Sequence, residues 1–190
     1  MSRELPHSNE AEQSLLGAMM IYPSVAAIAY DQGLEAKDFY LDIHKRIYTA
    51  MQDISDAGKP IDVTTLVSRL QDLEQLNLVG GADYIIKLSD TAISSANSSY
   101  YIDIIKSRAH LRRLIETAEL IAEEGFDTAS DLDEVMDKAE REILNVTRSR
   151  RATDFKSSRD VVSNVMQELM KLRSMEGHIT GVKTGYTDLD

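Results

Sequence analysis

Apolar residues recur along most of the chain at the three- and four-residue spacing that is typical of amphipathic helices. The pattern predicts helices that begin near Ser8 or Asn9, near Ser24, at Leu41, after Asp62 and after Gly81. Strict alternation of apolar and polar residues over six positions does not occur, and the sequence has no Asn-Gly or Asp-Gly hairpin signal. The sequence therefore predicts an all-α fold, in which residues 1–97 form a helical globular head.

The pattern becomes longer and more regular after this head. Residues 98–124 predict one helix about 40 Å long, which Gly125 ends. A second helix is predicted from Asp131 or Asp133, because its apolar residues are spaced 4, 3, 4 and 3, as in a coiled coil: Leu132, Met136, Ala139, Ile143 and Val146. A connection of about six residues forces the two helices to lie antiparallel. We therefore expect a helical hairpin over residues 98–147. Its apolar face is wider than a two-helix seam needs, so we expect part of that face to contact another subunit.

The last forty residues differ from the rest. Residues 148–157 have no apolar period and predict a linker. Residues 158–174 predict one further amphipathic helix, and residues 175–190 are mostly polar. A helix between linkers cannot bury its apolar stripe alone, so we expect it to dock on a partner or on another domain. The stripe consists of Val162, Val165, Met166 and Leu169.

Charge and composition narrow the possible functions. The 190 residues include 32 acidic and 21 basic side chains, and the formal net charge of −11 argues against simple coating of a phosphate backbone. Residues 151–190 hold six acids and six bases, which again indicates a boundary near residue 150. Without cysteine the chain cannot form a disulfide or a thiolate metal site. No 18-residue apolar run and no signal peptide are present, so we expect a cytoplasmic protein without a membrane span.

Catalytic motifs are incomplete. Residues 177–184 superficially resemble a phosphate-binding loop, but three residues instead of four separate the glycines, and Val182 separates Gly181 from Lys183. The four histidines include no pair at the spacing of a helical zinc site, and we expect His44 to be a packed or capping residue. The sequence therefore predicts no catalytic, cofactor-binding or metal-binding residue in this chain. A metal- or acid-dependent hydrolase on a helical scaffold remains the weakest alternative.

Several short segments resemble, in the same order, bacterial replicative hexameric DNA helicases of the DnaB type. They are LPHSNEAEQSLLG (5–17), DFY (38–40), HKRIY (44–48), GKPID (58–62), GGADY (80–84), NSSYY (97–101), LRRLI (111–115) and ITGVKTGYTDLD (179–190). The last segment resembles the lead-in to the family's RecA-like motor. Ser94 and Ser95 depart from the family, which often has proline nearby.

The resemblance implies the N-terminal domain and linker of such a helicase. In the family, hairpins pair into dimers, three dimers form a collar on the hexameric ring, and the collar binds the C-terminal domain of primase. The linker helix docks on the neighbouring motor domain. The full-length protein unwinds duplex DNA with ATP and magnesium, and its catalytic and main DNA-binding residues would lie beyond residue 190. This fragment itself is therefore expected to have no enzymatic activity and no cofactor.

The resemblance also suggests interface residues by position. Ile115, Ile121 and Tyr84 are candidates for the surfaces that hold the collar together or receive primase, and Glu10 is a weaker candidate. Ordinary core packing is the alternative role for each of these residues. A stand-alone helical adaptor or helicase loader is the alternative function for the whole chain.

Overall fold

The computed structural model describes residues 4–92, 94–126, 131–152 and 166. Its contacts divide the chain into two units, Met1–Thr153 and Asp154–Asp190. The described part of the first unit is built from helices and contains no strand, which confirms the predicted all-α class. None of the described helices is long and apolar enough to cross a membrane. The elements are α1 (Asn9–Ile21), α2 (Pro23–Asp31), η1 (Ala36–Asp38), α3 (Asp42–Asp56), α4 (Val63–Asp72), η2 (Leu76–Val79), α5 (Gly81–Asp90), α6 (Ser98–Phe126) and α7 (Leu132–Ala152).

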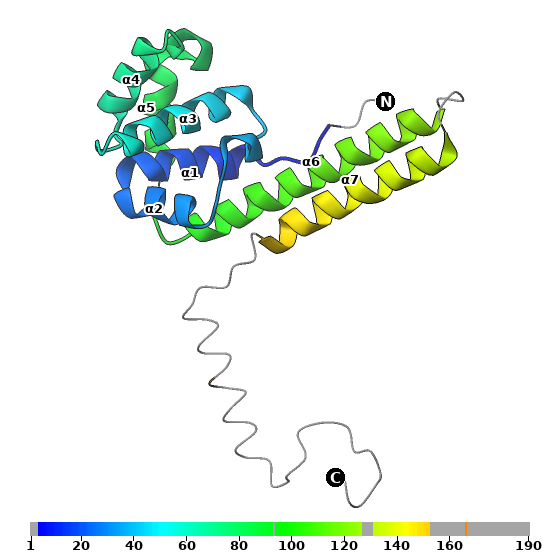
Figure 1. Cartoon of the computed structure of the whole chain (residues 1–190). Helices are drawn as coiled ribbons and strands as arrows, with labels where there is room; N and C mark the ends of the chain where they lie inside the picture. The colour runs from blue at the N-terminus through cyan, green and yellow to red at the C-terminus, as the bar shows by residue number, and fades with distance from the viewer. Residues whose placement is uncertain (1–3, 93, 127–130, 153–165, 167–190) are drawn as a thin grey trace, which may run out of the picture. The chain divides into compact units, whose positions relative to one another are not determined.

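The head is formed by α1 to α5 around one apolar core (Figure 1). Helix α1 is central, since it packs against α2, α3, α5 and α6. The first turns of α6 belong to the same core, where Ile102, Ile105 and Ala109 are buried. The packing of the head thus extends into the long helix, past the boundary expected at residue 97. Consequently α6 is shared, with its first half in the head and its second half in the hairpin.

Helix ends in the head follow the signals that the sequence carries. Ser8 precedes α1, and its side chain accepts a hydrogen bond from the Ala11 amide. Asp62 precedes α4 in a capping box, because its carboxylate accepts from the Thr65 amide while the Thr65 hydroxyl oxygen accepts from the Asp62 amide. Both caps confirm the predicted starts. Gly80, with a φ of 94°, ends η2 in a left-handed conformation that favours glycine.

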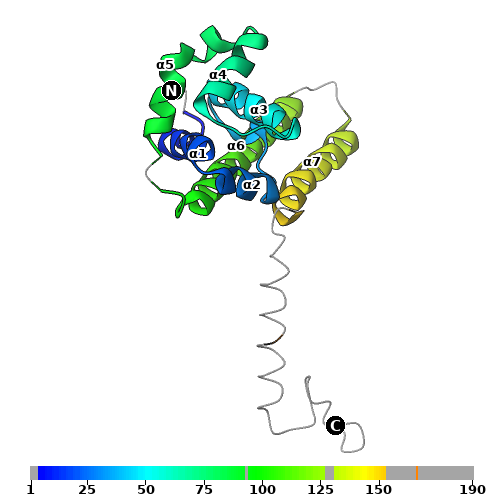
Figure 2. The ribbon, with the colours of Figure 1, turned by 90° about the vertical axis from the view of Figure 1, so that its left-hand side faces the viewer.

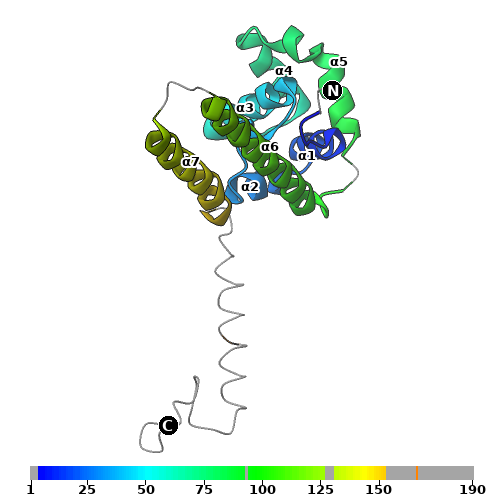
Figure 3. The ribbon, with the colours of Figure 1, turned by 90° about the vertical axis from the view of Figure 1, so that its right-hand side faces the viewer.

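Helices α6 and α7 lie side by side and form the predicted antiparallel hairpin, which extends beyond the head in Figure 1 and is foreshortened in the turned views of Figures 2 and 3. An ion pair between Glu124 on α6 and Lys138 on α7 links them near the turn. Two boundaries differ from expectation. Gly125 lies inside α6, because glycine weakens a helix without always ending it. Helix α7 continues to Ala152, five residues past the expected end at residue 147.

The residues of α7 that face α6 differ in part from the predicted seam. Leu132, Met136 and Ile143 are exposed, while Ala139 and Val146 are half-buried. The half-buried positions of α7 include Val135 and Glu142, each one residue before a predicted seam position. The side of α7 that is half-buried therefore keeps Ala139 and Val146 of the predicted seam and replaces Met136 and Ile143 by Val135 and Glu142. The prediction for Leu132, Met136 and Ile143 was wrong, and these side chains face away from the α6 contact.

Gly17 allows α1 and α5 to approach closely. A Cβ atom at this position would lie 2.1 Å from the Leu88 carbonyl oxygen and 2.9 Å from the Thr91 hydroxyl oxygen. The first contact involves backbone, so the neighbour cannot rotate away. Alanine at position 17 would therefore force the two helices apart.

We expect Gly17→Ala to lower the free energy of unfolding by about 2 kcal/mol, as overpacking of a close contact does. Gly125→Ala is the matched control, because a Cβ at this helical glycine meets nothing within 4 Å. The control should leave stability unchanged or raise it by up to about 1 kcal/mol. Urea unfolding followed by circular dichroism measures both, and equal midpoints for the two variants would contradict the role of Gly17.

Candidate functional site

Three polar side chains from three helices of the head form a hydrogen-bonded chain. Glu12 on α1 is 1% exposed, and its Oε2 atom lies 2.6 Å from Nδ1 of His44 on α3, which is fully buried. The other ring nitrogen of His44, Nε2, lies 2.8 Å from Oη of Tyr84 on α5. Tyr84 is half-buried. The chain therefore leads from a buried carboxylate to a phenol at the edge of the core.

Local helix geometry explains why these polar residues are inside. Glu12 lies three residues before the buried Leu15, and His44 lies three residues before the buried Ile47, so each shares the core-facing side of its helix. A buried polar group costs free energy unless it is hydrogen-bonded. Glu12 and His44 therefore need each other, although 32 positions separate them in the sequence.

The second oxygen of Glu12 and a nearby cation complete the buried site. Oε1 of Glu12 accepts a hydrogen bond from the Tyr40 backbone amide over 2.7 Å. The guanidinium of Arg112 on α6 lies 5.5 Å from the centre of the Tyr40 ring. Burial lowers the pKa of Arg112, and the negative charges of Glu12 and Asp38 oppose that shift. Arg112 thus supplies positive charge to the region that holds the Glu12 carboxylate.

Arg112 and its neighbour also attach α6 to the head. Arg112, only 7% exposed, donates to the Pro6 carbonyl oxygen over 2.8 Å and to the Asp38 carbonyl oxygen over 2.5 Å. Arg113 lies 3.4 Å from Oδ1 of Asp38, whose other carboxylate oxygen accepts from the Glu35 amide. Two adjacent arginines therefore fix the segment before α1 and the η1 turn against the long helix.

The predicted residues Tyr84 and Glu10 lie on neighbouring helices of the head. Gln13 of α1 donates from Nε2 to Oη of Tyr84 over 3.4 Å. Glu10 is exposed one turn before Gln13, on the same side of α1. Burial raises the pKa of Tyr84, and the charge of Glu12 adds to that effect. The phenol is therefore neutral and able both to donate and to accept one or more hydrogen bonds.

The predicted residues Ile115 and Ile121 lie on α6, in a different place. Both are half-buried, and Ile121 follows Thr117, which is buried at 8% exposure, by one turn on the same helix. The four predicted interface residues thus fall into two groups, one on the head and one on the hairpin. Of the predicted linker stripe, only Met166 is described, as a helical residue that is 55% exposed. Val162, Val165 and Leu169 lie outside the described residues.

The hairpin carries more exposed apolar side chains than the head. On α6 they are Leu111, Leu114 and Leu120, followed by Phe126 at 86% exposure. On α7 they are Leu132 at 73%, Met136 at 62%, Ile143 and Leu144. Large apolar side chains that are exposed in such numbers on two paired helices are typical of an interaction surface. The expectation of excess apolar face on the hairpin is confirmed by these exposures.

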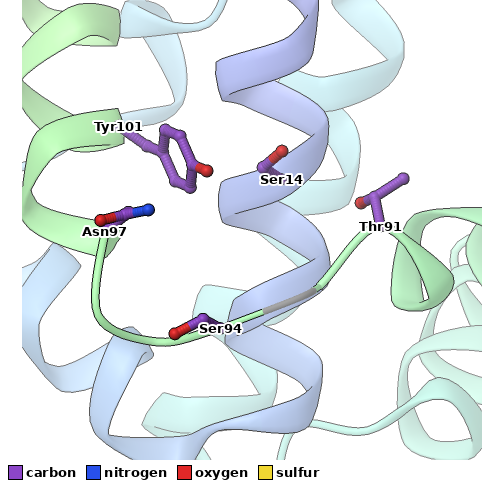
Figure 4. Close-up of a pocket in the computed structure, with 5 residues that line it drawn as sticks. All are labelled: Ser14, Thr91, Ser94, Asn97 and Tyr101. Atoms are coloured by element: carbon purple, nitrogen blue, oxygen red, sulfur yellow. The ribbon is translucent and has the colours of Figure 1, made fainter.

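Two small cavities lie in the head, and neither combines groups for catalysis. One, of about 130 Å³, is lined by the uncharged polar side chains of Ser14, Thr91, Ser94, Asn97 and Tyr101, with Ser14 of α1 between the α5 and α6 sides (Figure 4). The hydroxyl of Thr91 lies 2.7 Å from the Leu88 carbonyl oxygen, which already occupies its donor. The cavity is smaller than ligand pockets generally are.

The second cavity, of about 270 Å³, is lined by Tyr30, Leu34, Gln52 and Asp56. Burial raises the pKa of Tyr30 to about 12, so its phenol cannot act as a base near neutral pH. Across residues 4–92, 94–126 and 131–152, no group of three metal-ligating side chains is placed to hold a metal ion.

Sequence reasoning missed the two charged residues on which the site depends. Neither Glu12 nor Arg112 is among the interface or packed residues that the sequence predicts. The spacing of both residues does indicate burial, because each lies one turn from a buried apolar residue on the same side of its helix. Glu12 precedes Leu15 by three residues, and Arg112 follows Ala109 by three. His44 was expected to be packed, and its complete burial confirms this.

Comparison with known proteins identifies the family. The family model of the DnaB-like helicase N-terminal domain matches residues 4–107, more than half of the chain. The chain belongs to this family. Its structure resembles the crystal structure of the N-terminal domain of DnaB helicase from Mycobacterium tuberculosis, with a TM-score of 0.71 and 33% identity over 75% of this chain and 99% of that one. The predicted resemblance and the predicted architecture of head and hairpin agree with this finding.

Longer relatives match nearly the whole chain. The replicative DNA helicase DnaB of Geobacillus stearothermophilus is 36% identical over 97% of this chain, and the replicative DNA helicase DnaC of Bacillus subtilis is 35% identical over the same share. This chain spans about 40% of the length of each of these curated relatives. A DnaB-like replicative helicase, solved in a study of its interactions with primase, shares the fold at 23% identity and a TM-score of 0.63, covering 96% of this chain and 39% of that one.

Removing the buried cation Arg112 should make the head less stable against unfolding. We expect Arg112→Met to lower the free energy of unfolding by about 3 kcal/mol, because it leaves the carbonyl oxygens of Pro6 and Asp38 without their donor and removes a positive charge near the Glu12 carboxylate. Arg108→Met is the control, since Arg108 is exposed one turn earlier on α6 and should change stability by less than about 0.5 kcal/mol. Urea denaturation of both variants tests this, and equal losses would refute the assigned role of Arg112.

Proposed function

We propose that this chain is the N-terminal collar and linker of a replicative DNA helicase. In this role it joins subunits into a ring and binds primase at the replication fork. The full-length protein unwinds duplex DNA with ATP and magnesium in the cytoplasm. The observation that carries the proposal is the exposed apolar surface of the hairpin, in a chain that belongs to the DnaB-like helicase N-terminal domain family.

The outer side of α6 supports pairing with a second copy. Leu111, Leu114, Ala118 and Ala122 recur at intervals of three and four residues, and all four are exposed. Such a stripe is the pattern of a helix that packs against another helix. The small side chains of Ala118 and Ala122 allow the partner helix to approach closely. A second hairpin of the same chain is the natural occupant, because a two-fold axis brings the same stripe from both copies together.

Helix α7 adds to this surface. Leu132, Met136 and Ile143 lie four and seven residues apart, on one side of the helix and away from the α6 contact. Association of two hairpins would bury these side chains, which a single hairpin leaves in water. Three such dimers, joined through their heads, would make the collar of a six-subunit ring.

Primase binding is supported by fold and by position. The structural neighbour that was solved in a study of primase interactions shares the arrangement of head and hairpin with this chain. We assign the primase-binding or collar surface to Tyr84, Glu10, Ile115 and Ile121. The linker helix, through Val162, Val165, Met166 and Leu169, would dock on the motor domain of a neighbouring subunit.

The 190-residue chain should associate through its hairpin at tens of micromolar. We expect Leu111→Glu combined with Leu114→Glu to shift the sedimentation-equilibrium mass to that of a monomer, because charges would then enter the apolar contact. Leu78→Glu is the control, since Leu78 is 60% exposed on η2 of the head. It should leave association unchanged. A wild-type monomer, or a double variant that still associates, would contradict hairpin pairing.

Primase binding can be measured by calorimetric titration of the chain with the primase of the same organism. We expect Glu10→Ala to weaken the affinity about threefold or more, because an exposed charge at an interface contributes to recognition. Asp90→Ala is the control, as Asp90 is an exposed acid at the far end of α5. Equal affinities for wild type and Glu10→Ala would remove Glu10 from the interface, and no heat with wild type would refute primase binding.

A further inference from the structure

The hydrogen-bonded chain of Glu12, His44 and Tyr84 joins a buried carboxyl group to a residue of the proposed interface. Each of its two hydrogen bonds can run in either direction, with either atom as the donor. The relevant distances are 2.6 Å from Glu12 Oε2 to His44 Nδ1 and 2.8 Å from His44 Nε2 to Tyr84 Oη. Each link has one proton to share. The direction in which these protons point decides what the Tyr84 hydroxyl offers to a partner.

The groups around Glu12 fix the first proton. Oε1 of Glu12 accepts from the Tyr40 amide over 2.7 Å, which leaves Oε2 for the contact with Nδ1 of His44 over 2.6 Å. A carboxylate offers only acceptors, so with Oε2 as the acceptor Nδ1 of His44 donates to it. In a neutral imidazole the other nitrogen, Nε2, is then an acceptor.

The groups around Tyr84 agree with this direction. Because Nε2 of His44 accepts, the Tyr84 O–H donates inward to it. Gln13 donates to the same oxygen from the side, over 3.4 Å, which uses one lone pair of Tyr84. The donor of the phenol is therefore occupied inside the head. The hydroxyl oxygen of the half-buried Tyr84 can then only accept a further hydrogen bond from a partner.

We propose that Glu12 and His44 are positioning residues that hold the Tyr84 hydroxyl as a hydrogen-bond acceptor, so that the partner must present a donor at this point. This inference rests on the proposed function, since it takes Tyr84 as part of the primase-binding surface. The complementary group is an N–H donor, from an amide or from a basic side chain. A partner with only a carboxylate or a carbonyl at that place would be rejected, because two acceptors would face each other.

Glu12→Gln tests the direction while keeping the shape. The amide oxygen of the new side chain must accept from Tyr40, so its NH₂ group faces Nδ1 of His44 and donates to it. His44 then carries its proton on Nε2 and donates to Tyr84 Oη. The phenol O–H is released toward the partner, and the acceptor becomes a donor.

Two measurements on the full 190-residue chain decide the proposal. Nitrogen-15 spectra of the imidazole should show His44 protonated on Nδ1 in the wild type and on Nε2 in Glu12→Gln. Primase affinity, by calorimetry, should fall about five- to tenfold in Glu12→Gln and by a similar factor in Tyr84→Phe. The double variant should bind no more weakly than Tyr84→Phe alone, because both changes act on one hydroxyl. Asp90→Asn, a charge-to-amide change at an exposed position, is the matched control and should bind as wild type does.

These measurements separate a failure of the hydrogen-bond direction from a failure of the proposed primase binding. Wild-type His44 protonated on Nε2 would overturn the proposal even if Glu12→Gln does not fold, and urea midpoints report folding. Additive losses in the double variant would also overturn it, since Glu12 would then act apart from Tyr84. If wild-type chain does not bind primase, the proposed function fails and the binding role of Tyr84 fails with it, whereas the tautomer still decides the direction of the chain. If primase binds but Tyr84→Phe binds as tightly as wild type, the hydroxyl is not a contact.

Discussion

The head depends on one buried carboxylate. Glu12 lies on the central helix, and its two oxygens contact the Tyr40 amide and His44, which belong to other parts of the head. A carboxylate inside a protein is tolerated only if it is hydrogen-bonded and balanced by positive charge. Arg112 of α6 supplies positive charge to the same region, and the charge of Glu12 opposes the lowering of the Arg112 pKa by burial. The helices α1, α3 and α6 thus share polar contacts around Glu12 in addition to the apolar core that they build together.

The same requirement explains how the hairpin is held. Arg112 also donates to the carbonyl oxygens of Pro6 and Asp38, and Arg113 pairs with the Asp38 carboxylate. These contacts occur where α6 leaves the head. The hairpin is thus attached to the head through a continuous helix and two arginines. A rigid attachment suits a part whose exposed apolar side chains must meet another molecule in a defined orientation.

Local patterns predicted the elements well, and long-range polar contacts escaped prediction. The Ser8 and Asp62 caps, the antiparallel hairpin and the all-α class follow from spacing within a few residues, which a single sequence displays. The pairing of Glu12 with His44 joins positions 32 residues apart, and no local pattern reveals it. The shift of the α7 stripe has another cause. Apolar residues of α7 cover more than one side of the helix, so spacing alone could not decide whether Val135 or Met136 faces α6. Tyr84 and Glu10 were suggested only by resemblance, because their own spacing indicates nothing about a partner.

The head and the hairpin therefore differ in how much apolar surface each exposes to water. The head buries most of its apolar side chains around one core and holds the half-buried Tyr84 in a hydrogen-bonded chain with Glu12 and His44. The hairpin leaves leucine and methionine side chains in water on both of its helices. Oriented hydrogen bonds give specificity, whereas apolar area gives affinity with little discrimination. A subunit that assembles with copies of itself and also recognises a different protein needs both kinds of surface. Because α6 belongs to both the head and the hairpin, one chain can place the two surfaces at different positions.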